Sequence, residues 1–340
     1  MTLVSTPENP APPGAIEQEV LTRDGVRLRC ARWLPEDPEP RGTVAVLGGR
    51  GDFMEKYFEL ASGLLARGFA VVMMDWRGQG GSDRPLRNAR KGHVDDFLDY
   101  ERDLAALADA LREAHRPRPW IGLAHSMGAA VVLSADASGH APFDRLVLTS
   151  PLVAVKGVDH RGPLRYLIGA LDGLGLGGAF APGYNSRNLW QAGFAGNPLT
   201  TDAHRFARIA GLVAAAPQIA LGGATIGWVH AAFRALRRLD EPDFPGRIGT
   251  PVLIVASGAD RVTDTAAAER FAARLTSGRA VVVDGAEHEV LIERDVLRDQ
   301  FWAAFDAFAP ARPERSAGSW LIGSAMRRQP GRNVDTPLRN

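Results

Sequence analysis

The chain has 340 residues, 45% hydrophobic and 23% charged, which is enough for one large α/β domain with an insertion or for two domains. A formal net charge of +1 argues against a nucleic-acid-binding protein, which would carry a basic excess. Cys30 is the single cysteine, which excludes a fold stapled by intrachain disulfides and is compatible with a reducing compartment.

Residues 1–15 are rich in proline and carry neither a basic start nor an apolar run. We therefore expect a disordered N-terminus and no signal peptide. These features predict a cytoplasmic protein, with a peripheral position at the inner face of the membrane as an alternative.

A β-hairpin pattern at residues 16–34, with Asp24-Gly25 at its turn, leads into a chain of alternating strand and helix patterns. Short apolar runs typical of strands occupy residues 43–47, 69–74, 121–124, 146–148, 252–256 and 280–283. Helical patterns occupy residues 54–67, 94–111, 265–275 and 290–308. This alternation predicts an α/β fold, with a mostly parallel central sheet flanked by helices, built from residues 16–150 and 246–309.

The alternation stops between residues 151 and 245, where glycine, alanine and tryptophan are frequent and no strand pattern is clear. We expect a helical cap over the carboxyl edge of the sheet. Residues 209–229 hold no charge, but Pro217 and Gly222-Gly223 interrupt them, so a buried or substrate-facing helical pair is favoured over a membrane span.

Residues 310–340 form a separate, arginine-rich end of the chain, which contains six arginines and two acidic residues, Glu314 and Asp335. This composition predicts a flexible tail. Trp320, Leu321 and Ile322 give it an alternative role as a weak peripheral membrane anchor.

The most informative motif is Ala124-His125-Ser126-Met127-Gly128, which joins a short apolar run to a helix-compatible stretch. A sharp strand–turn–helix with small residues two positions either side of a serine is typical of a nucleophile elbow. The serine hydroxyl then stands clear of the backbone, beside a helix N-terminus that favours an oxyanion. The alternative is a strand followed by a helix with a serine cap.

A serine nucleophile needs a base, and the base needs an orienting carboxylate, in the chain order Ser…Asp…His for this topology. Asp260 and His288 each follow a predicted strand, on the same sheet edge as Ser126. Asp260 has the alternative role of a helix cap, for which Asp264 is better placed. Seven other histidines compete with His288, but only His288 follows a strand in the last segment.

An oxyanion requires two preorganised N–H donors. The backbone amide of Met127 is expected to be one, and the loop Gly48-Gly49-Arg50-Gly51 is expected to supply the other. Nucleotide-binding glycine patterns and clusters of metal-ligating residues are both absent from the sequence, so we expect no cofactor and no metal.

These motifs together resemble the α/β-hydrolases of the lysophospholipase L2 and monoacylglycerol lipase type, also called the serine aminopeptidase S33 group, over residues 16–308. The resemblance is carried by residues 49–59, Asp75-Trp76-Arg77-Gly78-Gln79-Gly80-Gly81-Ser82, His125-Ser126-Met127-Gly128, Ser257-Gly258-Ala259-Asp260 and Gly285-Ala286-Glu287-His288-Glu289. It implies a triad of Ser126, Asp260 and His288, with oxyanion donors at Arg50 and Met127. Two departures, Gly48-Gly49 in place of His-Gly and Ala124 in place of glycine, bear on rate and specificity.

The first functional hypothesis is a carboxylic-ester hydrolase acting on a lysophospholipid or monoacylglycerol, whose acyl chain residues 209–229 could contact. The second is an aminopeptidase that releases N-terminal residues from short peptides. Between residues 151 and 239 there is no glutamate, and the aspartates are Asp159, Asp172 and Asp202, which leaves little to hold a substrate amine. The third, a non-catalytic binding protein of the same fold, conflicts with the complete set of triad candidates.

Overall fold

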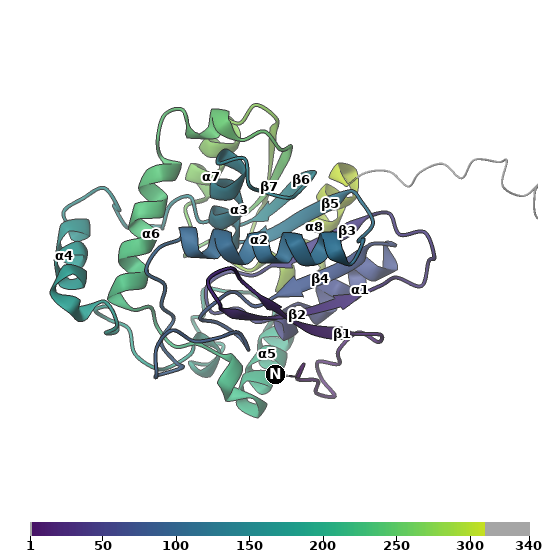
Figure 1. The fold of residues 1–340 in the computed structure, drawn as a ribbon, viewed down its shortest axis with the longest axis horizontal. Helices are drawn as coiled ribbons and strands as arrows, with labels where there is room; N and C mark the ends of the chain where they lie inside the picture. Colours follow the sequence, from purple (N-terminus) through teal and green to yellow (C-terminus); the bar gives the residue numbers. More distant parts are fainter. Residues whose placement is uncertain (1, 310–340) are drawn as a thin grey trace, which may run out of the picture. The chain divides into compact units, whose positions relative to one another are not determined.

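The computed structural model describes residues 2–309. Its centre is an eight-stranded sheet in the order β1-β2-β4-β3-β5-β6-β7-β8 (Figure 1). The hairpin of β1 (Ile16–Leu21) and β2 (Arg27–Trp33) is antiparallel, and β2 also pairs antiparallel with β4. All other neighbours run parallel. These strands are β3 (Thr43–Leu47), β4 (Ala70–Met74), β5 (Trp120–His125), β6 (Arg145–Thr149), β7 (Val252–Ser257) and β8 (Gly278–Val283).

The sheet is buried on both faces because side chains alternate along each central strand. On one face Ala45 and Leu47 of β3 pack with α2 (Leu98–Glu113), α3 (Met127–Ala137) and α7 (Thr265–Ala272). On the other face Val44 and Val46 pack with α1 (Phe58–Ala66) and α8 (Asp295–Phe308). Two hydrophobic cores therefore sandwich the sheet, as the predicted α/β class requires.

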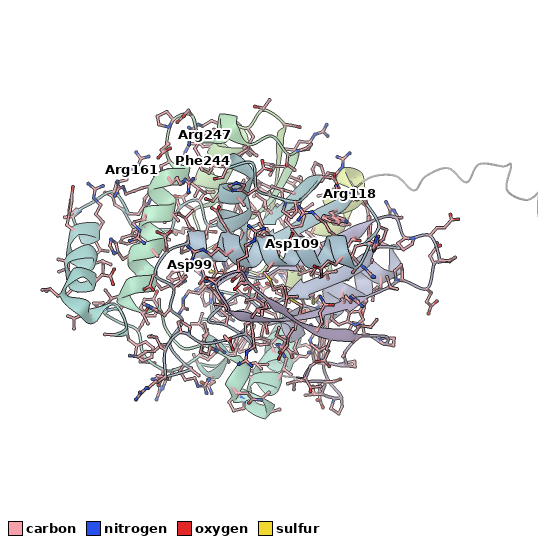
Figure 2. The ribbon with its side chains drawn as sticks, viewed as in Figure 1. Asp99, Asp109, Arg118, Arg161, Phe244 and Arg247 are labelled. Carbon is pink, nitrogen blue, oxygen red and sulfur yellow. The ribbon has the colours of Figure 1, made fainter. Side chains whose placement is uncertain are left out.

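Helix α2 illustrates how the outer layer forms. Its inward positions Tyr100, Leu104 and Leu107 are buried, and the side chain of Asp109 on its outer side is half-exposed (Figure 2). The helical pattern predicted a start at residue 94, but α2 begins at Leu98. The preceding residues bridge to the insertion instead, through a β-bridge between Gly92 and Ala224.

Two predicted helices are divided in the structure. The predicted helix 54–67 consists of a 3-10 turn, η1 (Met54–Tyr57), followed by α1, and it ends as expected before Gly68, whose φ is +83°. The predicted helix 290–308 consists of η6 (Val290–Ile292) and α8, which are separated at Glu293-Arg294 because both residues have extended backbone.

The N-terminal segment corrects one expectation. Residues 1–15 were predicted to be disordered, but Asn9 is buried and its side chain donates to the Glu55 carbonyl at 2.9 Å. The indole of Trp33 donates to the Pro12 carbonyl at 3.0 Å. Proline-rich composition suggested disorder, but these specific hydrogen bonds fix the segment against the core.

Residues 151–245 form the predicted insertion, and every regular element within it is helical. Its elements are α4 (Leu164–Leu171), η2 (Asp172–Leu176), η3 (Leu189–Gln191), α5 (Ala203–Ala215), η4 (Pro217–Ile219), α6 (Ile226–Leu239) and η5 (Phe244–Arg247). The amide of Glu289, after β8, donates to the Leu199 carbonyl at 2.8 Å, and the amide of Asp264, after β7, donates to the Ala154 carbonyl at 3.1 Å. The insertion therefore meets loops at the carboxyl edge of the sheet.

The uncharged stretch 209–229 is not one continuous helix. Its first half joins a small separate core with Phe53 and Trp190, and Ile226 belongs to the main core. Among residues 2–309, no helix is both long enough and apolar enough to cross a membrane. The predicted tail and its anchor residues at 310–340 lie outside the described residues.

Candidate active site

Ser126 lies at a strained turn between β5 and α3. Its φ is +49°, a left-handed value that is costly for a residue with a side chain and is typical of a functional turn. Gly128 explains why the motif ends in glycine, because a Cβ there would lie 2.6 Å from the Gly48 carbonyl oxygen. Ala124 is fully buried, so the sheet accommodates its one methyl group.

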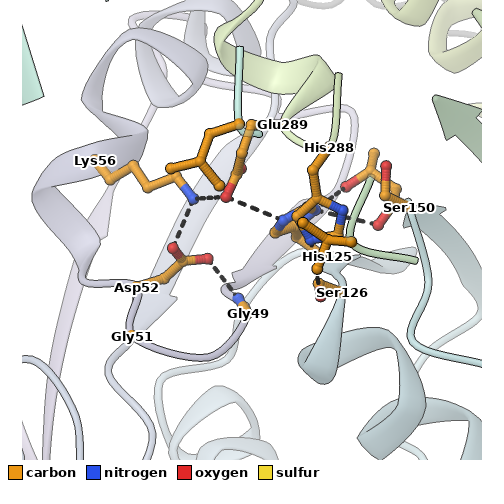
Figure 3. Close-up of polar contacts among 12 residues, drawn as sticks. Gly49, Gly51, Asp52, Lys56, His125, Ser126, Ser150, His288 and Glu289 are labelled. Atoms are coloured by element: carbon orange, nitrogen blue, oxygen red, sulfur yellow. Dashed lines mark hydrogen bonds and ion pairs between the residues drawn. The ribbon is translucent and has the colours of Figure 1, made fainter. Parts of the chain in front are cut away.

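The structure brings together the three residues that the motifs predicted. His288 Nε2 lies 3.1 Å from Ser126 Oγ (Figure 3). His288 Nδ1 lies 2.8 Å from Asp260 Oδ2. All three side chains are largely buried. A hydroxyl, an imidazole and a carboxylate are thus joined in one hydrogen-bonded chain, which is the geometry that activates a serine.

Asp260 is held as an anion by several donors. Its carboxylate accepts from the backbone of Val262 at 2.7 Å and from the Thr263 hydroxyl at 2.7 Å. Burial alone would raise the pKa of Asp260, but the hydrogen bond from His288, supported by these donors, holds that pKa below its ordinary value. Asp264 instead caps α7 by accepting from Ala267 N at 2.8 Å, as predicted.

The glycine-rich loop (residues 48–51) passes directly over the serine. A Cβ on Gly49 would lie 3.1 Å from Ser126 Cβ, a contact tighter than most side chains make. Gly49 N donates to Asp52 Oδ2 at 2.6 Å, and Gly51 N donates to the Gln79 side chain. Within residues 2–309 no acceptor meets the N–H of Arg50 between them.

The backbone N–H of Met127 is the other predicted donor. It is the first amide of α3 and likewise has no acceptor in the described part of the chain. The side-chain amide of Gln79 donates to the sulfur of the same residue, Met127 Sδ, at 3.8 Å. Trp76 Nε1 donates to the Gly48 carbonyl at 2.8 Å and fixes the start of the loop.

Motif reasoning missed a buried charge network beside the triad, formed by Asp52, Lys56, His125 and Glu289 (Figure 3). Lys56 Nζ lies 2.6 Å from Asp52 Oδ1 and 2.5 Å from Glu289 Oε1. His125 Nε2 lies 3.2 Å from the same Glu289 oxygen. Because Glu289 follows His288 and His125 precedes Ser126, this network holds both triad segments.

The pKa values of the network follow from its pairing. Burial would raise the pKa of Glu289, but the charges of His125 and Lys56 outweigh burial and hold it far below its usual range. Burial would lower the pKa of Lys56, but Asp52 and Glu289 raise it. The only sequence signal was the spacing of Asp52 and Lys56, four residues apart and therefore able to pair.

Ligand atoms of Asp52, His125 and Glu289 lie within 4.8 Å of one another, which resembles a metal site. However, the Lys56 ammonium contacts both carboxylates and already supplies the positive charge. The arrangement is therefore a lysine-centred ion network rather than a set of free metal ligands.

The competing histidines have other partners. His93 bonds Thr225, His160 lies 2.5 Å from Asp240, and His230 lies 2.7 Å from Asp172. His115 and His140 are exposed. Of the described histidines, His288 alone bonds the Ser126 hydroxyl.

Comparisons with known proteins show the family of the chain. A model of the family described as serine aminopeptidase, S33, matches residues 38–295. Lysophospholipase L2 of Escherichia coli K12 is 32% identical over 294 residues, covering 83% of this chain and 84% of that protein. The probable lysophospholipase L2 of Haemophilus influenzae is 30% identical over 283 residues, covering 83% and 88% of the two chains.

Solved structures with lower identity share the fold. A soluble variant of monoglyceride lipase from Saccharomyces cerevisiae superposes with a TM-score of 0.68 at 18% identity, covering 86% of this chain and 94% of that one. A carboxyl esterase from Bacillus coagulans gives a TM-score of 0.69 at 17% identity, covering 86% and 97%.

Proposed function

Because the chain belongs to the serine aminopeptidase S33 family of α/β-hydrolases, we propose that it is a serine hydrolase that cleaves carboxylic esters of lipid-like substrates, either lysophospholipids or monoacylglycerols. The observation that carries the proposal is the hydrogen-bonded chain Ser126–His288–Asp260. Relatives named lysophospholipase L2 support the choice of substrate.

In the proposed mechanism Ser126 is the nucleophile, His288 the general base and Asp260 the orienting carboxylate. Ser126 Oγ attacks the ester carbonyl carbon while its proton passes to His288 Nε2. The same proton leaves with the alcohol when the C–O bond breaks, which produces an acyl-enzyme. Water then loses a proton to His288 and releases the fatty acid, and Ser126 regains its proton.

The backbone N–H groups of Arg50 and Met127 are proposed to stabilise the oxyanion. Their lack of acceptors among the described residues supports this role, because the neighbouring N–H groups of Gly49 and Gly51 are already bonded. Donors fixed in advance stabilise developing charge without reorganisation at the moment of reaction.

The insertion, residues 151–245, is proposed to act as a cap that carries acyl contacts. Leu221, in the uncharged stretch, lies against the glycine-rich loop, since its Cβ lies 3.9 Å from the position of a Cβ added to Gly51. Leu221→Asn should raise KM for a decanoyl ester and spare an acetyl ester, because each covered methylene is worth about 0.8 kcal/mol. Equal losses for both esters would show that Leu221 is ordinary core.

Weak peripheral contact with a lipid surface is part of the proposal. Leu167 and Leu174, on α4 and η2 of the insertion, are 55% and 76% exposed, and Tyr166 is 65% exposed. Exposed apolar side chains of this kind insert into lipid interfaces. Leu174→Asp should weaken flotation with vesicles of phosphatidylglycerol, whereas Val296→Asp on α8 should not. Cytoplasmic location, at the inner membrane face, stays a prediction from composition.

The aminopeptidase alternative has less support. The insertion's three aspartates between residues 151 and 239 are all engaged: Asp159 accepts from Arg161 N, Asp172 pairs with His230, and Asp202 caps α5. None of them is a free carboxylate reserved for a substrate amine.

A substrate panel tests the proposed function. Purified protein is assayed with p-nitrophenyl esters of graded chain length, with lysophosphatidylcholine and with aminoacyl-nitroanilides. We expect ester hydrolysis that is lost in Ser126→Ala together with fluorophosphonate labelling. Faster hydrolysis of the anilides than of the esters, or labelling that survives Ser126→Ala, would contradict the proposal.

A further inference from the structure

Arg50 differs from Arg29 and Lys56, two fully paired cations near the same edge of the sheet. Arg29 pairs with Glu55 and Asp75, and Lys56 pairs with Asp52 and Glu289. Arg50 forms no ion pair with any carboxylate of residues 2–309, although its Nε is buried and has no hydrogen-bond partner there. A buried charge without a counter-ion is costly, so this residue calls for a ligand.

The surroundings of the Arg50 guanidinium are neutral. Nη2 donates to the Gly222 carbonyl at 3.1 Å, and Cζ lies 5.1 Å from the ring centroid of Trp228. Burial lowers the pKa of Arg50, and only the nearby hydroxyls of Tyr100 and Tyr184 oppose this. A carbonyl and an aromatic face orient a guanidinium but do not neutralise it.

Three further cations of the core donate to carbonyl groups of the insertion. Arg90 donates to the Ala220 carbonyl at 3.2 Å, and Lys91 donates to the Gly178 carbonyl at 2.5 Å. Arg84 donates to the Gln218 carbonyl at 3.3 Å. Like Arg50, none of the three forms an ion pair with a described carboxylate.

The reach of Arg50 matches one class of substrate. In a 1-acyl lysophospholipid, the phosphorus is separated from the ester carbonyl carbon by as many covalent bonds as separate Arg50 Cζ from its own backbone nitrogen. An ester carbonyl held at the Arg50 N–H therefore carries its phosphate into range of the same residue's guanidinium. Guanidinium groups bind phosphate oxygens in a bidentate manner.

We propose that the Arg50 side chain binds the phosphodiester of a lysophospholipid and selects this substrate over neutral monoacylglycerols. The inference rests on the proposed function, whose substrate class it narrows. Arg50 then has two roles: its backbone N–H donates to the oxyanion, and its guanidinium binds the phosphodiester of the head group.

The test is a selectivity ratio. kcat/KM is measured for 1-lauroyl lysophosphatidylcholine and for 1-lauroylglycerol, which share one acyl chain, and the ratio is compared between variants. Arg50→Met should lower the ratio by about 10- to 100-fold, the range of a lost charge-assisted hydrogen bond. Arg50→Lys should retain more of the ratio. Arg187→Met, an exposed arginine of the insertion, is the control and should not change it.

A binding measurement separates this role from a merely structural one. Dodecylphosphocholine, which has no ester to cleave, should inhibit p-nitrophenyl butyrate hydrolysis competitively, with a weaker Ki in Arg50→Met. The neutral analogue 1-O-dodecylglycerol should inhibit both proteins alike. Inorganic phosphate should inhibit neither strongly, and equal Arg50-dependent inhibition by phosphate alone would overturn the lipid assignment.

The outcomes for the two proposals are distinct. If Arg50→Met lowers Tm but leaves the ratio of the two kcat/KM values unchanged, the side chain has only a structural role and the inference is overturned. Wild-type protein that cleaves 1-lauroylglycerol but not the lysophospholipid would also overturn it, and would leave the ester hydrolase intact. Wild-type protein that cleaves neither lipid would refute the proposed function. The Arg50 dependence of inhibition by dodecylphosphocholine would then test phosphodiester binding separately.

Discussion

Asp260 and Asp264 follow β7 within one loop, but their carboxylates contact different groups. Asp260 accepts from His288, whereas Asp264 accepts from the first turn of α7. Asp260→Asn should favour the wrong tautomer of His288 and lower kcat by up to roughly 10⁴, by analogy with the serine protease template. Asp264→Asn should change kcat little, because asparagine also caps helices. Steady-state kinetics on p-nitrophenyl butyrate check this, and reversed effects would contradict the assignment.

Gly128 is constrained by backbone rather than by side chains. Its missing Cβ would lie 2.6 Å from the Gly48 carbonyl oxygen and 2.8 Å from that of Leu47. Gly128→Ala should therefore push the glycine-rich loop away from Ser126, at a cost of about 1–3 kcal/mol in stability. Because the loop carries an oxyanion donor, kcat should fall by roughly 10²-fold or more.

The matched control for this change is Gly211→Ala in α5, where nothing lies within 4 Å of the added Cβ. It should stabilise the protein by about 0.5–1 kcal/mol through helix propensity. Urea unfolding and kinetics of both variants decide the matter. Full activity in Gly128→Ala would mean that the loop tolerates the shift.

The three triad candidates were predictable because each belongs to a loop that directly follows a strand, and parallel strands bring such loops to one edge. The charge network was not. Glu289 lies 233 residues from Lys56 in the sequence, so tertiary packing decides whether it meets Lys56 and Asp52. Arg50 was named for its backbone through the family resemblance, but nothing in the sequence indicated that its side chain lacks a counter-ion.

At the scale of elements, composition misjudged the N-terminal segment. Asn9 is 2% exposed, and its side chain satisfies the Glu55 carbonyl within η1. Asn9→Ala should cost about 1–3 kcal/mol, because a buried acceptor loses its donor. The exposed neighbour Glu8 is the control, and Glu8→Ala should change the free energy of unfolding by less than about 0.5 kcal/mol. No loss in Asn9→Ala, with rapid proteolysis before residue 16, would restore the disorder prediction.

Strand positions were predicted more closely than helix limits, for a physical reason. Strands β3 and β4 are continuous apolar runs buried on both faces, a pattern that few alternatives produce. Helix starts depend on contacts that the sequence does not display. The predicted α2 start moved from residue 94 to Leu98 because His93 bonds Thr225, a residue of the distant insertion.

At the scale of the molecule, one carboxylate joins three helices. Glu59 of α1 accepts from Arg205 of α5 at 2.6 Å and from Arg298 of α8 at 2.5 Å. Arg208 of α5 lies 2.7 Å from its other oxygen. Insertion and core are thus tied through a single acidic side chain, which is 29% exposed. Removing its charge leaves three guanidinium groups facing one another.

This arrangement predicts how stability depends on pH. Burial would raise the pKa of Glu59, but the hydrogen bond from Arg205 and the charges of Arg298 and Arg208 outweigh it and hold that pKa at about 2. The folded value therefore lies below the ordinary value of 4.5. Glu59 stabilises the folded state fully above pH 4.5, and this contribution is lost as pH falls through 4.5 toward 2.

Glu59→Gln should consequently lower the free energy of unfolding at pH 7 by about 1–3 kcal/mol, after allowance for solvent screening. The difference from wild type should shrink as pH falls from 4.5 toward 2, because the wild-type carboxylate then loses its charge. Urea unfolding at pH 7, 5 and 3 measures it. Asp306→Asn, which removes an exposed partner of Arg67, should have little effect at any of these pH values. A Glu59→Gln difference that stays constant or grows on acidification would mean that the carboxylate is not held as an anion by its three arginines.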